Sequence, residues 1–163
     1  MKTLLIVHHS HTGGALAMAR AAATGAACES SVRVRFETAL ECGPQALLDS
    51  DGYLFVCPEN LAAISGLMKD FFDRSYYEVL GRIEGRPYAN LICAGSDGTN
   101  AARQIERIAT GWRLHAVAPT LIVCTHAQTP EEILKLKIIA PAELARCEEI
   151  GATLAAGLEL GIF

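Results

Sequence analysis

The sequence lacks any apolar run long enough to cross a lipid bilayer. A spanning helix needs about 20 consecutive apolar residues, and no run approaches that length. The first apolar run ends at Val7 and is followed by no cleavage-site pattern, so we do not expect a signal peptide. We therefore expect a cytoplasmic protein with no membrane partner.

Clustered positive charge is also missing. The chain carries 14 Lys and Arg against 18 Asp and Glu, a formal net charge of −4. Nucleic-acid-binding proteins usually show a basic patch or stripe. We expect no nucleic acid as partner.

Cysteine pairs with metal-binding or redox spacing do not occur. The six cysteines form no C-x-x-C pair and have no histidine at zinc spacing, so we expect reduced thiols. Three of them end apolar runs and are expected to behave as small core residues: Cys57, Cys93 and Cys124. The histidines near the N-terminus lack an accompanying carboxylate cluster, so we predict no metal site.

Two common nucleotide-binding motifs are absent. No lysine lies between Lys2 and Lys69, which excludes an N-terminal Walker A loop, and G-x-G-x-x-G does not occur. In their place, residues 9–14 read His-Ser-His-Thr-Gly-Gly, between an apolar strand pattern and an alanine-rich helix pattern. Neutral donors at the positive end of a helix suit a monophosphate. The alternative is a tight turn that only caps the helix.

The remaining pattern is that of an α/β protein. At 163 residues with 51% apolar residues, the chain is expected to form a single domain, 1–163, around one sheet covered on both faces. Residues 32–36 alternate apolar with charged side chains, so this second strand should lie at an edge, which favours the strand order 2-1-3-4-5. Five strands are expected: Thr3–Val7, Val32–Phe36, Tyr53–Cys57, Tyr88–Ala94 and Thr120–Cys124.

Helices are predicted between the strands, which makes the five-stranded sheet parallel. Ser65 is expected to be the N-cap of one helix and Pro141 the first residue of the last one, whereas residues 125–140 are expected to be irregular. The other helices are predicted at Gly14 to about Ala27, Gly43–Leu48 and Ala101–Trp112. The loops that follow strands one, three and four should meet at one rim of the sheet, which is the usual ligand site in such sheets.

Three segments together resemble a known superfamily. They are Ser10-x-Thr12-Gly13-Gly14 with Met18-Ala19, Pro58-Glu59-Asn60 followed by Ser65-Gly66-Leu67-Met68-Lys69-Asp70-Phe71-Phe72-Asp73-Arg74, and Gly95-Ser96-Asp97-Gly98. In this order they resemble the flavin loops of the flavodoxin-like and NAD(P)H-dependent FMN reductase superfamily, over nearly the whole chain. The resemblance implies a flavodoxin-like three-layer α/β sandwich and FMN as cofactor.

The resemblance also implies a set of cofactor-binding residues. Those expected to hold the phosphate are Ser10, His11, Thr12, Gly13 and Gly14, those expected to line the isoalloxazine ring are Pro58, Glu59, Asn60, Leu61, Ala62, Ser65 and Gly66, and those expected to close its other side are Gly95, Ser96, Asp97 and Gly98. Many members of the superfamily place aromatic side chains in the second loop. This chain has residues 61–64, Leu-Ala-Ala-Ile, instead, which would leave the ring face open to a nicotinamide.

The expected function is that of an FMN-binding oxidoreductase, similar to FMN and quinone reductases, that passes electrons from NAD(P)H through the flavin to a small acceptor. No side chain is an obvious acid or base, so we name no catalytic residue. Two alternatives stay open: a flavodoxin-type electron carrier without nicotinamide activity, and a non-catalytic binding module. The apolar content makes a homodimer plausible.

Overall fold

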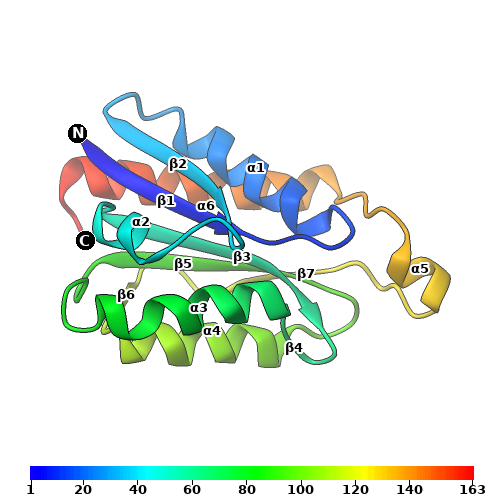
Figure 1. Ribbon diagram of the computed structural model, residues 1–163. Helices are drawn as coiled ribbons and strands as arrows, with labels where there is room; N and C mark the ends of the chain where they lie inside the picture. The colour runs from blue at the N-terminus through cyan, green and yellow to red at the C-terminus, as the bar shows by residue number, and fades with distance from the viewer.

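The computed structural model describes residues 1–163 as a three-layer α/β fold (Figure 1). The main sheet has the order β2-β1-β3-β5, with β6 and β7 both beside β5, and all of these pairs are parallel. The predicted order and the edge position of the second strand are confirmed. The strands are β1 Lys2–His8, β2 Val32–Thr38, β3 Gly52–Asn60, β4 Ala63–Ile64, β5 Pro87–Ala94, β6 His115–Ala116 and β7 Leu121–Cys124.

Six helices connect and cover the strands, and none of them is long and apolar enough to cross a membrane. Figure 1 shows α1 and α6 on one face of the sheet and α3 and α4 on the other. The helices are α1 Gly14–Ala26, α2 Pro44–Leu48, α3 Gly66–Val79, α4 Thr99–Gly111, α5 Pro130–Leu134 and α6 Pro141–Leu160.

The sheet separates two apolar cores. Successive side chains of a strand point to opposite faces, so Leu4 and Ile6 of β1 pack into the core beneath α1 and α6. Leu5 and Val7 pack into the core beneath α2, α3 and α4. The buried apolar runs of the central strands follow from this double coverage.

Two glycines allow α1 and α6 to pack closely. A Cβ atom at Gly25 would collide with the backbone carbonyl of Glu148, and one at Gly151 would collide with the backbone carbonyl of Ala22. Both glycines lie inside their helices, where the missing side chain costs helix propensity. The close approach of the two helices explains why glycine occupies both positions.

The segment after Cys57 differs from the predicted loop. Strand β3 continues through Pro58 to Asn60 and pairs antiparallel with β4. The two turn residues, Leu61 and Ala62, both have positive φ (50° and 62°), a conformation that non-glycine residues rarely adopt. Ser65 does precede α3 at the N-cap position, but its hydroxyl makes no capping hydrogen bond.

The segment of residues 125–140 is not wholly irregular, so that prediction was wrong. It contains α5, which begins with Pro130 at its first turn and has a capping box between Thr129 and Glu132. The helix buries no residue, and this is why no apolar periodicity predicted it. All six cysteines are free thiols, and of the three expected in the core Cys57 and Cys93 are buried whereas Cys124 is partly exposed.

Candidate functional site

A cavity of about 80 Å³ lies at the carboxyl ends of β1, β3 and β5. The structure brings residues of all three predicted loops to this cavity. Those that line it are Ser10, His11, Thr12, Gly14, Pro58, Glu59, Asn60 and Gly95. The remaining predicted residues lie outside its lining: Gly13, Leu61, Ala62, Ser65, Gly66, Ser96, Asp97 and Gly98.

Further lining residues were not predicted from the sequence. Cys93 and Ala94 are the last residues of β5, and the end of a central parallel strand is itself a signal that could have found them. Thr125 and Ala127 follow β7, so a fourth loop contributes to the site. The complete set of additional residues is Ala15, Cys93, Ala94, Thr125, Ala127, Ile133 and Lys137.

The loop between β1 and α1 presents free hydrogen-bond donors to the cavity. Gly13 adopts a left-handed conformation (φ 86°), and its N–H donates to the Ser10 hydroxyl over 3.0 Å. The N–H groups of Thr12, Gly14 and Ala15 have no acceptor in the protein. Unpaired N–H groups at a helix N-terminus form a site for an anion.

Close contact beneath this loop requires glycine at its end. A Cβ atom at Gly14 would lie 2.6 Å from the Cys93 sulfur, so a side chain there would push α1 away from β5. Burial raises the pKa of the Cys93 thiol to about 11, against the opposing effect of the Lys137 charge. The thiol is therefore a neutral part of the cavity wall at pH 7.

Hydrogen bonds fasten the β3–β4 hairpin to the start of α4. The Glu59 carboxylate accepts from the Gly98 N–H over 2.9 Å. The Asn100 side chain donates to the Ala62 carbonyl over 2.6 Å, and the Ile64 N–H donates to Gln104 Oε1 over 2.9 Å. The second and third predicted loops therefore form one connected wall of the site.

Glycine is also required at the start of α4. Gly98 has φ 80°, and a Cβ atom there would lie 2.6 Å from Cγ2 of Ile122. The backbone turns tightly at this point and passes directly over the sheet. Helices α1 and α4 thus both begin after a left-handed glycine at the same edge of the sheet.

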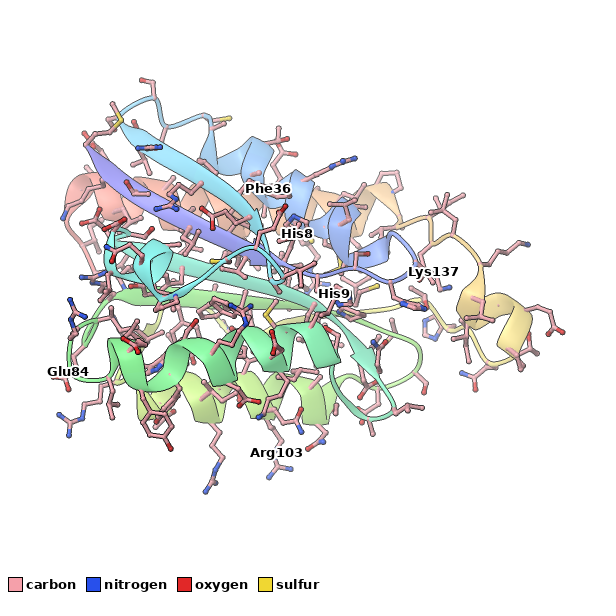
Figure 2. The ribbon with its side chains drawn as sticks, viewed as in Figure 1. His8, His9, Phe36, Glu84, Arg103 and Lys137 are labelled. Atoms are coloured by element: carbon pink, nitrogen blue, oxygen red, sulfur yellow. The ribbon has the colours of Figure 1, made fainter.

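Residues 129–140, which we call the strap, complete the site on the side of α5. The backbone N–H of Lys137 donates to the Thr12 carbonyl over 2.9 Å, which joins the strap to the β1–α1 loop. Figure 2 shows Lys137 between this loop and α5. The strap also covers Gly13, because a Cβ atom there would lie 2.8 Å from the Leu136 side chain.

A doubly wound sheet with a donor-lined cavity at the switch between β1 and β3 defines a flavodoxin-like α/β protein. Comparison with known proteins agrees with this class. The profile of the family described as NADPH-dependent FMN reductase matches residues 37–128, more than half of the chain. The chain belongs to this family, whose cofactor is FMN.

Individual relatives support the same fold. A flavodoxin of Aquifex aeolicus (strain VF5) is 30% identical over 96 residues, which are 59% of this chain and 50% of that protein. The aligned part of the chain thus spans about half the length of this relative.

Solved structures of flavodoxin-like domains superpose on nearly the whole chain. A flavodoxin from the domain Archaea and oxidised flavodoxin 1 of Bacillus cereus each have a TM-score of 0.77 at 16% identity, with 96% of this chain and 99% of theirs covered. The rubredoxin oxygen:oxidoreductase of Desulfovibrio gigas has a TM-score of 0.81 at 14% identity, with 99% of this chain and 37% of that chain covered. At these identities the likeness concerns the fold alone.

Proposed function

We propose that the protein holds FMN in the cavity at the strand ends and uses it to pass electrons from NAD(P)H to a small acceptor. The observation that carries the proposal is the set of unpaired N–H groups on Thr12, Gly14 and Ala15, beside the Ser10 and Thr12 hydroxyls. Several neutral donors in one concave loop fit a phosphate monoester.

The small size of the cavity supports separate places for the phosphate end and the ring of FMN. At about 80 Å³ it is well below the roughly 300–1,000 Å³ typical of small-molecule pockets. The enclosed part would hold the phosphate end of FMN, and the β3–β4 hairpin and the loop before α4 would hold the ring. The ring would then be accessible to a second ligand.

The protein's own residues bind and orient rather than react. Pro58 and Gly95 bring no charge to the cavity wall, and the Cys93 thiol is neutral. The Glu59 carboxylate beside Pro58 is held by the Gly98 N–H. When bound, FMN would supply the redox chemistry, namely the transfer of two electrons from NAD(P)H to the acceptor. We name no catalytic side chain.

An exposed hairpin tip supports access of a nicotinamide. Leu61 is fully exposed. It lies in the second loop, where the superfamily resemblance implies aromatic side chains in many members. An aliphatic side chain covers less of a flavin ring than a stacked aromatic ring does.

The apolar composition also supports a homodimer. Sedimentation analysis tests this, and a monomer would contradict it.

The proposal is tested by titrating FMN into the purified protein without oxygen. A perturbed flavin spectrum followed by bleaching with NADH or NADPH is the expected result. An unchanged spectrum, together with an unchanged melting temperature at FMN concentrations far above micromolar, would show that the rim binds something else or nothing.

The similarity to flavodoxins favours a second candidate, an FMN-dependent electron carrier. A carrier would bind FMN and bleach with dithionite but not with either nicotinamide. The two candidates therefore differ in one measurement on the same sample.

A further inference from the structure

Lys137 is the only lysine or arginine that lines the cavity. Its backbone N–H is held by the Thr12 carbonyl, and a Cβ atom at Gly14 would lie 3.2 Å from the Lys137 Cβ. The stem of the lysine is therefore fixed against the loop that carries the unpaired N–H groups. The fold therefore fixes where the lysine side chain begins, beside these N–H groups.

The charge of Lys137 is not neutralised. Its ammonium group donates to three backbone carbonyls at the end of α5, those of Glu132 (2.6 Å), Ile133 (2.7 Å) and Lys135 (2.7 Å), and it forms no salt bridge. These contacts satisfy its three N–H groups and leave the net charge in place. They are exposed, so water can replace them.

A phosphate oxygen is a better acceptor for an ammonium group than a neutral carbonyl, because both partners are charged. The β1–α1 loop offers a phosphate only neutral donors, although a phosphate monoester carries a charge of about −1.5 to −2 at pH 7. We propose that Lys137 binds the phosphate of FMN, exchanging at least one carbonyl of α5 for a phosphate oxygen. The inference rests on the proposed placement of that phosphate in the cavity.

The strap is then a part of the cofactor site. The same residue that closes α5 with its ammonium group is tied to Thr12 through its backbone. A phosphate held by both the loop and Lys137 would add a second polar connection between them. Binding of a phosphorylated flavin should therefore hold residues 129–140 more firmly against the β1–α1 loop.

The test compares FMN with riboflavin, which has the same ring and ribityl chain but no phosphate. Dissociation constants are measured by quenching of flavin fluorescence for wild type, Lys137→Met, Lys137→Arg and Lys135→Met. Lys135 is exposed, lies on the same strap and does not line the cavity, so its variant is the matched control.

The expected result for Lys137→Met is a roughly 5- to 30-fold loss of FMN affinity with an unchanged affinity for riboflavin. Lys137→Arg should retain most of the FMN affinity, and Lys135→Met should resemble wild type. Added salt should weaken FMN binding by wild type more than by Lys137→Met, because the variant lacks the charge pair.

Two outcomes would overturn the inference while FMN still binds the wild-type protein. One is an unchanged FMN affinity in Lys137→Met. The other is an equal loss for both flavins, which would mean that Lys137 holds the strap in place without contacting phosphate. Failure of the wild-type protein to bind FMN at all would instead contradict the proposed function.

Discussion

The Glu59 carboxylate accepts a hydrogen bond over 2.9 Å from the backbone N–H of Gly98, which lies 39 positions later in the chain. Glu59 belongs to β3, and Gly98 is the residue before α4. A negative charge at the start of a helix interacts favourably with the helix dipole. This contact is one of three hydrogen bonds that join the two segments proposed to face the flavin ring.

Substitution of Glu59 should loosen that wall. We expect Glu59→Ala to lower the free energy of unfolding by about 1–2 kcal/mol and to weaken FMN binding several-fold. Glu59→Gln keeps an acceptor oxygen and should recover most of both losses. Urea unfolding and FMN titration measure the two effects, and an alanine variant as stable as wild type would contradict the expectation.

Substitution of Gly151 should force α1 and α6 apart. We expect Gly151→Ala to destabilise the protein by at least roughly 1–3 kcal/mol, because the added methyl group meets the rigid Ala22 carbonyl. Gly66→Ala is the matched control, since Gly66 also lies in a helix but has nothing within 4 Å of an added Cβ atom. In denaturant unfolding, Gly151→Ala should lower the free energy of unfolding, whereas Gly66→Ala should leave it unchanged or raise it.

Glycine substitutions at Ala62 and Ala63, in and beside the β3–β4 turn, should have different effects on stability. Ala62→Gly removes the cost of a positive φ and should leave stability unchanged or raise it slightly. Ala63 lies in strand β4 and has no positive φ to relieve, so Ala63→Gly should lower the free energy of unfolding by about 1 kcal/mol. Equal effects of the two substitutions on thermal unfolding would argue against the left-handed turn.

Protonation of His8 should destabilise the protein in mild acid. Burial, with Arg20 and His9 nearby, lowers the pKa of His8, whose ring lies 4.3 Å from that of Phe36 (Figure 2). The unfolded chain therefore binds more protons than the folded one below the ordinary histidine pKa of about 6.5, so stability falls as the pH drops through that value.

The variant His8→Phe tests this pH dependence. It preserves an aromatic contact with Phe36 and removes the titrating group, so the plot of unfolding free energy against pH should become flatter between about pH 7 and 5. The comparison concerns the slope, because the substitution also changes the packing. A slope identical to that of wild type would assign the acid sensitivity to other groups such as His9, whose pKa burial also lowers.

The order of the sheet could be predicted because its evidence is local. The charged residues Arg33 and Arg35 alternate with apolar ones, and this alternation is possible only where one face of the strand meets solvent. The two glycine-containing loops could also be predicted from local sequence, because Gly13 and Gly98 mark sharp turns that lead into helices.

The hairpin and α5 could not be predicted by the same means. The two turn positions are Leu61 and Ala62, and neither is the Asn or Gly that signals a two-residue turn with positive φ. Helix α5 buries nothing, although the Thr129 and Glu132 capping box was present in the sequence as a weak signal. The arrival of Lys137 at Thr12 depends on tertiary contacts that no spacing in the chain encodes.

Helix α5 of the strap bears on cofactor exchange but not on the stability of the two cores. Helix α5 adds no side chain to either core, yet the residues after it cover the loop at Gly13. If FMN binds as proposed, we expect mutations within α5 to alter how quickly the cofactor enters or leaves while the folded scaffold keeps its resistance to heat and denaturant. Uptake kinetics and thermal endurance are thus open to independent adjustment, by selection or by engineering.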